Sequence, residues 1–228
     1  MTTAALPVWR SLLFVPVTAK RFVDGAARRG ADAIILDLED SVAASEKERA
    51  RTLVPEAAEI VSRGGADVVV RVNRPLRLAV RDIEAAVGSR VLALALPKTD
   101  SAEHVRLIAE IVDEVEAERG VAPGTTRLIA MVETAAAFFR IAEIARAHPR
   151  LCALNLGAEV AKSSAPRHCR CRSRWPCSPP EPPASCRWAL LARLPSSMIS
   201  TAFAIQSAAL AGLALSAPRS SIQAKCRS

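Results

Sequence analysis

Short apolar runs alternate with amphipathic stretches over the first two thirds of the chain. Each run is rich in Val, Ile, Leu or Ala, and after a polar turn apolar residues recur with the 3.6-residue period of a helix. Runs that are apolar on both faces are typical of parallel strands covered by helices. Their starts lie about 20 to 35 residues apart, which leaves room for one crossover helix after each strand. The six runs are residues 12–15, 33–38, 68–72, 91–96, 128–132 and 151–156.

Two of the intervening stretches show the helix pattern clearly. Residues 101–119 carry one apolar stripe, with Asp100 or Ser101 available as the N-cap and Gly120 after the last turn. Residues 135–147 repeat this design, with Thr134 as the expected cap. Six βα units are therefore expected. Their periodicity fits both a parallel (β/α) barrel and an open doubly wound sheet.

Composition divides the chain after residue 159. Residues 1–159 hold 21 basic and 22 acidic side chains, whereas residues 160–228 hold 10 basic side chains and a single acid, Glu181. The second segment also contains five of the six Cys and eight of the 15 Pro. We therefore expect a (β/α) domain over residues 1–159 and a basic tail of a different kind over residues 160–228.

Several classes of protein are disfavoured by the sequence. The first 15 residues lack the charged-then-apolar layout of a secretory signal, so we expect a cytoplasmic protein. The tail has no Cys-x-x-Cys pair, which argues against a structural zinc site. Its Arg-rich residues 169–174 belong to no recognisable nucleic-acid-binding fold. Residues 199–215 are short for a membrane span and include Ser, Thr and Gln. We expect neither a nucleic-acid partner nor a membrane partner.

Charged residues close five successive apolar runs. The carboxyl ends of parallel strands meet at one rim, where the chemistry of such folds gathers. Any one of these residues could be a solvated strand end or a helix cap, and Lys98 in particular could simply lead into a helix. The set comprises Asp37, Glu39 and Asp40 after the second run, Arg71 and Asn73 after the third, Lys98 after the fourth, Glu133 after the fifth and Glu159 after the sixth.

Three carboxylates within four residues would repel one another without a nearby cation. A hard divalent metal held by one or two carboxylates, with Arg71 gripping an anionic substrate, would account for the whole set.

Five ordered motifs within residues 10–159 resemble the signatures of a known family, the citrate lyase beta subunit and malyl-CoA lyase group of the HpcH/HpaI aldolase superfamily. The resemblance implies a TIM (β/α)8-type barrel, with about six βα units present and the last two strands lost or replaced by the tail. The motifs are Arg10-Ser-Leu-Leu-Phe-Val-Pro16, Gly30-Ala-Asp-Ala-Ile-Ile-Leu-Asp-Leu-Glu-Asp-Ser-Val42, Arg71-Val-Asn73, Leu96-Pro-Lys98 and Met131-Val-Glu-Thr134.

The same resemblance implies an activity and roles for the rim residues. The reaction is Mg²⁺-dependent, reversible carbon–carbon cleavage of a citryl-, malyl- or citramalyl-CoA-type thioester into acetyl-CoA and a keto acid. Asp37, Glu39 and Asp40 would be catalytic, ordering metal-bound water and substrate. Arg71 would clamp a substrate carboxylate, and Glu133 would bind substrate and metal. Mg²⁺ and a fixed Arg can stabilise the enolate that such cleavage leaves, without a redox cofactor.

The family pattern ends at Gly157-Ala158-Glu159-Val160, where the family carries a Gly-x-x-Asp element whose acid is the second metal ligand. Glu159 is the expected substitute. The tail has the properties of a coding sequence translated in a shifted reading frame. Codons compatible with the stretch ending in residues 221–226 read Ile-His-Pro-Ser-Gln-Val after the shift, and the family carries Ile-His-Pro-x-Gln-Val near its C-terminus. The same shift turns residues 196–203 into Glu-Phe-Asp-Asp-Leu-Asp-Gly-Phe.

Two other functions stay open on the sequence alone: a non-catalytic relative that binds an acyl-CoA or a partner subunit, and an aldolase acting on free 2-keto acids. The resemblance also implies trimers or hexamers in which C-terminal segments close neighbouring sites. The tail of this chain is not expected to do so.

Overall fold

The computed structural model describes residues 8–88, 90–157 and 191–192. Strands and helices alternate along these residues, as the apolar pattern predicts. The strands are β1 (Leu12–Pro16), β2 (Ala33–Asp37), β3 (Asp67–Arg71), β4 (Ala93–Leu96), β5 (Arg127–Val132), β6 (Leu151–Leu156) and β7 (Leu191–Ala192). The helices are α1 (Lys20–Ala26), α2 (Lys47–Ser62), α3 (Leu76–Ala86), α4 (Ala102–Glu118), α5 (Ala135–Phe139) and α6 (Ile141–Ala145), with a 3-10 turn at Ala44–Glu46.

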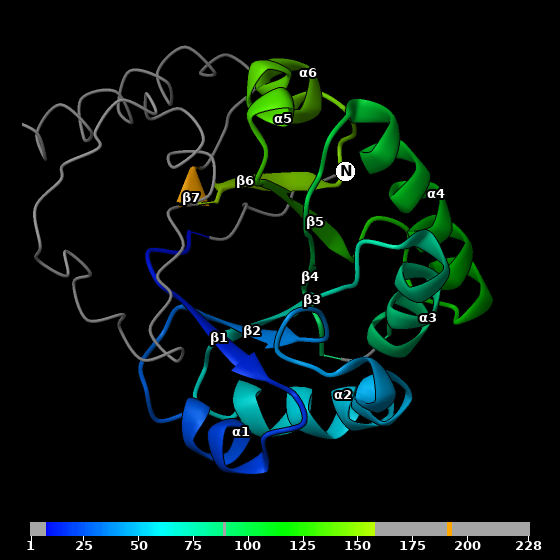
Figure 1. The fold of residues 1–228 in the computed structure, drawn as a ribbon. Coiled ribbons are helices and arrows are strands. Elements are labelled where there is room, and N and C mark those ends of the chain that lie inside the picture. Colours follow the sequence, from blue (N-terminus) through cyan, green and yellow to red (C-terminus); the bar gives the residue numbers. More distant parts are fainter. Residues whose placement is uncertain (1–7, 89, 158–190, 193–228) are drawn as a thin grey trace, which may run out of the picture.

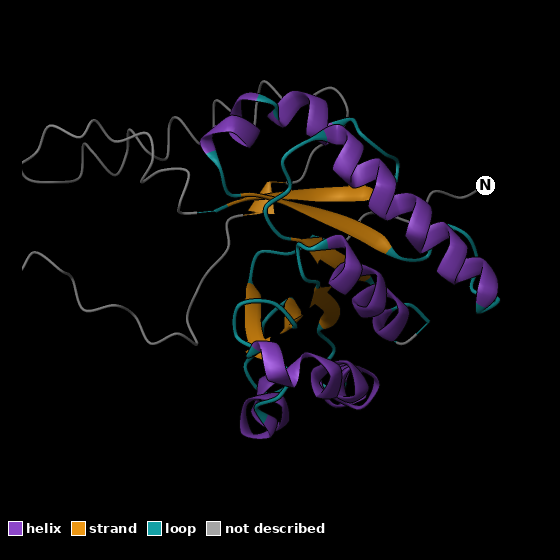
Figure 2. Cartoon of the chain, turned by 45° about the vertical axis from the view of Figure 1, so that its right-hand side comes forward, coloured by secondary structure: helices purple, strands orange, loops and turns teal. Residues whose placement is uncertain are grey.

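The sheet has the strand order β1-β2-β3-β4-β5-β6-β7, and β1 to β6 are parallel. Figure 1 shows these strands as an arc, with the helices following one another around its outside. In Figure 2 the helices line one side of the sheet. A doubly wound sheet would reverse its strand order and carry helices on both faces. The sequential order is that of a (β/α) barrel, which confirms the fold that the resemblance implies.

Two layers of apolar side chains lie on opposite faces of the sheet because neighbouring residues of a strand point in opposite directions. On β2, Ile34 and Leu36 pack toward the helices, in the larger core. Ala33 and Ile35 join the second cluster, on the concave face. Asp37 and Arg71 have the parity of this concave set, so their side chains end the inner face of their strands.

The predicted elements agree closely with the observed ones, and one helix differs. Ser101 caps α4 and Thr134 caps α5, each accepting a backbone N–H three residues on. The single helix expected over residues 135–147 is instead two short helices that meet at Arg140. Among the described residues, no helix is long and apolar enough to cross a membrane.

The expected domain boundary after residue 159 lies outside the described residues. Beyond Gly157, the structure describes only β7, which pairs antiparallel with β6 through two residue pairs. The parallel seventh strand of a closed barrel is therefore not seen in the described part of the chain.

Candidate active site

A bidentate ion pair between β2 and β3 forms the base of the site. The parallel register makes Asp37 and Arg71 direct neighbours at the strand ends. Arg71 donates from Nε to Asp37 Oδ1 at 2.7 Å and from Nη2 to Oδ2 at 2.6 Å. Both side chains are almost buried, and the guanidinium lies 5.1 Å from the ring centre of Phe14 on β1. A fork-to-fork pair in this setting fixes the orientation of both groups.

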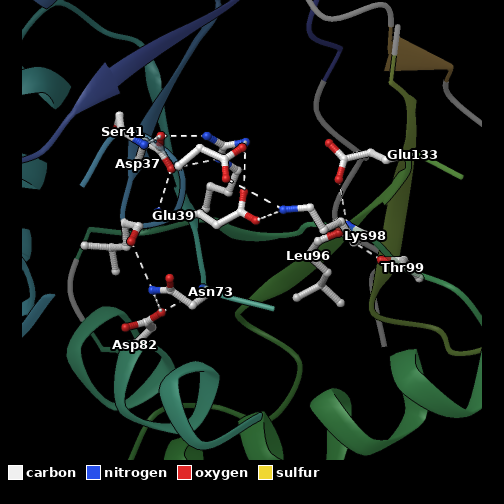
Figure 3. Close-up of polar contacts among 12 residues, drawn as sticks. Asp37, Glu39, Ser41, Asn73, Asp82, Leu96, Lys98, Thr99 and Glu133 are labelled. Carbon is white, nitrogen blue, oxygen red and sulfur yellow. Dashed lines mark hydrogen bonds and ion pairs between the residues drawn. The ribbon is translucent and has the colours of Figure 1, made fainter. Parts of the chain in front are cut away.

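Two further carboxylates and one ammonium lie beside this pair. Arg71 Nη1 is 3.1 Å from Glu39 Oε2 and 3.6 Å from Asp40 Oδ2. From the end of β4, Lys98 reaches across the rim and donates to Glu39 Oε1 at 2.6 Å, with Asp40 Oδ1 at 3.6 Å (Figure 3). Glu39 is buried, whereas Asp40 is largely exposed. The structure thus brings the three predicted catalytic acids and Arg71 together.

Glu133 lies on the other side of Lys98, at the end of β5. Its Oε2 accepts the backbone N–H of Lys98 at 2.8 Å. Lys98 has a φ of +48°, in the left-handed region that non-glycine residues seldom adopt. One residue therefore touches Glu133 with its backbone and Glu39 with its side chain (Figure 3).

The turn that presents Asp37 and Glu39 is held by one half-buried and one buried polar side chain. Lys47, the first residue of α2, donates to the carbonyl oxygens of Leu38 at 2.6 Å and Glu39 at 2.7 Å. Asn73 Nδ2 donates to the same Leu38 oxygen at 3.0 Å. The turn is therefore tied to both α2 and the end of β3.

A second carboxylate anchors Asn73 in turn. Asp82 Oδ2 accepts the backbone N–H and the side-chain amide of Asn73, and Asp82 Oδ1 accepts Arg51 Nε at 2.7 Å. Sequence reasoning did not identify Lys47, Arg51 or Asp82 as site residues. They lie inside helices, where the strand-end rule offers no signal.

Burial and charge move the pKa values of the two buried acids in opposite directions. For Asp37, burial alone would raise the pKa, but the bonds and charge of Arg71 outweigh it and hold the pKa below its ordinary value. For Glu39, burial dominates and raises the pKa despite Lys98 and Arg71. The bond to Glu39 raises the pKa of Lys98, so its ammonium stays protonated at neutral pH. The raised pKa makes Glu39 a better candidate for proton exchange than Asp37, whose pKa is lowered.

The described residues contain no group of three or more His, Cys, Asp or Glu side chains arranged to hold a metal. Asp37 and Glu39 are engaged by the side chains of Arg71 and Lys98. Glu133 accepts a backbone N–H, that of Lys98, so its carboxylate can also offer oxygen to a hard cation. Mg²⁺ commonly uses one or two carboxylates and keeps several waters. Glu133 fits as one ligand, and Glu159 lies outside the described residues.

The fold and the rim together define a class: a (β/α)-barrel protein with an acid, Arg and Lys site at the carboxyl ends of its strands. The HpcH/HpaI aldolase/citrate lyase family matches residues 10–161, more than half of the chain. The chain belongs to this family.

Named relatives agree with this assignment. The chain is 39% identical over 151 residues to the citrate lyase subunit beta of Escherichia coli K12, covering 66% of this chain and 50% of the relative. It is 36% identical over 156 residues to a (3S)-malyl-CoA thioesterase of Cereibacter sphaeroides, covering 68% and 50%. The solved structure of CitE from Mycobacterium tuberculosis in complex with magnesium and pyruvate matches with a TM-score of 0.51 and 32% identity, covering 71% of this chain and 61% of that one. The chain thus spans about half the length of the curated relatives it matches.

Proposed function

We propose that this chain carries the site of a Mg²⁺-dependent carbon–carbon lyase that cleaves a β-hydroxyacyl-CoA thioester into acetyl-CoA and a keto acid. The observation that carries the proposal is the guanidinium of Arg71. Two of its N–H groups hold Asp37, while Nη1 faces Glu39 Oε2 at 3.1 Å as an ion pair; neither Nη1 nor the second N–H of Nη2 makes a hydrogen bond within the described part of the chain. An oriented Arg with spare donors beside an acid of raised pKa suits a substrate carboxylate and a proton transfer.

The chain's own residues supply the steps around the bond that breaks. Arg71, fixed by Asp37, binds the carboxylate of the keto-acid half through Nη1. Glu39 takes the proton of the β-hydroxyl group. The bond between the α- and β-carbons then breaks, the β-carbon becomes the keto carbonyl, and the electron pair stays on the thioester half as an enolate. Return of a proton to that carbon gives acetyl-CoA.

Lys98 and Glu133 complete this arrangement. Lys98 keeps an ammonium beside Glu39 and Asp40, which offsets the repulsion between the two acids. Glu133, together with Glu159 from outside the described residues, would hold Mg²⁺. The bound metal would supply a Lewis acid that stabilises negative charge on substrate oxygen. That the similar protein CitE was solved in complex with magnesium and pyruvate supports the choice of this metal and of a keto acid as ligands.

A second candidate is hydrolysis of the thioester, and it is favoured by the similarity to a (3S)-malyl-CoA thioesterase. The same rim residues could bind malyl-CoA while water attacks the thioester carbonyl. The two reactions give different products from one substrate: a lyase forms glyoxylate and acetyl-CoA, whereas a thioesterase forms malate and free CoA.

The deciding experiment incubates the full chain with malyl-CoA and citramalyl-CoA, with and without Mg²⁺, and identifies the products by chromatography. Mg²⁺-dependent keto acid with acetyl-CoA supports the lyase, and free CoA with the intact hydroxy acid supports the thioesterase. If neither forms but either thioester binds, the non-catalytic alternative is correct. Turnover of free hydroxy or keto acids alone would identify the free-acid aldolase. Arg90→Ala, a change at an exposed side chain whose partner Glu59 is also exposed, serves as the control for the effects of preparing a variant.

We further propose that residues 160–228 are read in a shifted frame, which would separate them from the domain over residues 1–159. Sequencing the gene across codons 150–170 tests this directly. A gained or lost base that restores Gly-x-x-Asp and Ile-His-Pro-x-Gln-Val supports the shift. An unchanged frame supports a truncated barrel with a foreign tail, of which little activity is expected. The trimer or hexamer typical of the family is then not expected by size-exclusion chromatography either.

A further inference from the structure

The carboxylate of Glu133 is placed by backbone groups. Its Oε2 accepts the N–H of Lys98 at 2.8 Å, and Figure 3 shows the side chain extending from the end of β5 toward Lys98. Asp37 and Glu39 are also held by the side chains of Arg71 and Lys98, and Asp37 accepts the backbone N–H groups of Glu39 and Ser41 as well. The position of Glu133 therefore depends on what surrounds its methylene groups.

Gly157 covers those methylene groups. A Cβ added at Gly157 would lie 2.9 Å from Glu133 Cγ and 3.4 Å from both Cβ and Cα of Glu133. The glycine cannot move away freely, because its N–H is bonded to the carbonyl oxygen of Val132 at 2.9 Å, continuing the β5–β6 ladder. The close approach is thus built into the sheet.

The backbone of Gly157 does not itself require glycine. The described glycines with φ in the left-handed region are Gly30, Gly65, Gly88, Gly120 and Gly124, and Gly157 is not among them. An alanine could adopt its conformation without backbone strain. The steric reason for glycine at position 157 is the side chain of Glu133.

We propose that Gly157 is a positioning residue for Glu133: by lacking a Cβ, it leaves the space that Glu133 Cγ occupies when the carboxylate accepts the Lys98 N–H. Any side chain at position 157 displaces Cγ of Glu133 and swings the carboxylate off that donor. The consequence for metal binding rests on the proposed function, in which Glu133 is a ligand of Mg²⁺. The positioning itself does not depend on the metal.

The amide of Lys98 reports on Glu133 without metal or substrate. The chain contains five lysines, so ¹⁵N-lysine labelling of the full chain gives a sparse amide spectrum, and Lys98→Arg identifies the relevant peak. Glu133→Ala removes the acceptor, which should shift this peak and speed its hydrogen exchange about tenfold. Gly157→Ala should produce the same change although Glu133 is still present. An unchanged Lys98 peak in Gly157→Ala overturns the proposal.

A thermal-unfolding cycle gives a second test. Gly157→Ala alone should lower the melting temperature by about 2–4 °C. In a Glu133→Ala background, Cγ is gone, and the same change should have little effect. Gly25→Ala is the matched control, since nothing lies within 4 Å of the added Cβ and its φ is not left-handed. Equal losses in both backgrounds would show that Gly157 acts on something other than Glu133.

Mn²⁺ titration then separates the positioning from the proposed function. If wild type binds Mn²⁺, Gly157→Ala should bind it about tenfold more weakly, as expected when the support of a ligand is lost. If wild type binds no Mn²⁺ while the Lys98 amide still responds to Gly157→Ala, the positioning holds and the metal-dependent function is wrong. Equal Mn²⁺ affinity in the two proteins, with a shifted Lys98 peak, would remove Glu133 from the ligand set.

Discussion

Two buried Arg–carboxylate clusters occupy opposite ends of the same sheet, and they are built differently. At the amino ends of β5 and β6, Arg150 bonds Asp113, Glu116 and the carbonyl oxygen of Thr126. These contacts use all five of its N–H groups. Arg71, at the carboxyl ends, uses two for hydrogen bonds to described residues.

The acids of the two clusters differ in the same way. Both oxygens of Glu116 accept backbone N–H groups as well as Arg150, and these bonds outweigh burial and lower its pKa. Glu39 accepts Lys98 on Oε1, but its Oε2 accepts no hydrogen bond from the described residues, and burial raises its pKa. A saturated cluster stabilises the fold, whereas an unsaturated one keeps donors and a proton site for a ligand.

The largest effect, on the free energy of unfolding, is expected when the saturated cluster is broken. Arg150→Ala leaves the buried carboxylate of Glu116 without its cation and should lower the free energy of unfolding by about 3–5 kcal/mol. Urea denaturation measures this change. Arg90→Ala removes an arginine whose side chain and partner Glu59 are both exposed, and it should change stability by less than about 0.5 kcal/mol. Similar losses in the two variants would contradict the distinction.

The next largest effect, on catalysis, is expected when the unsaturated cluster is broken. Arg71→Ala should reduce kcat/KM for the thioester at least about 100-fold, because the fixed donor that places the substrate carboxylate is lost. Steady-state assays across Mg²⁺ concentrations measure it. Arg71→Lys keeps the positive charge but loses the bidentate donor geometry of the guanidinium, so it should recover only a small part of the activity. Full activity in Arg71→Lys would mean that charge alone is needed.

A smaller effect concerns the support of the acidic turn. Lys47→Met removes two hydrogen bonds to carbonyl oxygens and should cost about 1 kcal/mol of stability. It should also lower kcat more than it raises KM, since Asp37 and Glu39 shift together. Lys20→Met is the surface control, because among the described residues that ammonium pairs with the exposed Asp24 alone, at 3.1 Å. Equal effects of the two changes would argue against a role for Lys47 in placing the turn.

The smallest effect sharpens the contrast between Glu39 and Glu116 through pH. A raised folded-state pKa makes the ionised form of Glu39 unfavourable in the native protein, so wild type loses stability as pH rises from its ordinary pKa of 4.5 through the folded value. Glu39→Gln should therefore gain stability relative to wild type over that interval. Urea midpoints between pH 4 and pH 8 measure the difference. A wild type that instead gains relative stability as pH rises would reverse the assigned direction.

Glu116→Gln should show the opposite trend. Because the folded-state pKa of Glu116 is lowered, its contribution to stability is present above its ordinary pKa of 4.5 and lost as pH falls through the folded value. The variant should therefore be least stable relative to wild type at neutral pH, and the gap should close on acidification.

Local patterns were enough to locate the elements and the rim. The apolar runs predicted six strands to within about two residues, the usual uncertainty of an element's end. The rule that functional residues follow the carboxyl ends of parallel strands predicted one common edge for the five residues that the structure places there: Asp37, Glu39, Asp40, Arg71 and Glu133. Both predictions, of the strands and of the rim residues, rest on the pattern of apolar residues within each strand and on the expectation that the strands are parallel. That pattern is carried by residues close together in the sequence.

Other features follow only from how distant segments meet. Whether the βα units form a barrel depends on strand order, which periodicity does not encode. Lys98 follows β4 and has a left-handed backbone, and its side chain bonds Glu39, which follows β2. This contact forms only when the ends of both strands lie at the same rim. Lys47 and Asp82 reach the site from helices, and Gly157 meets Glu133 across β5 and β6. The sequence by itself determined which residues reach the rim. Tertiary packing decided which of them pair, because pairing depends on distances between segments far apart in the chain.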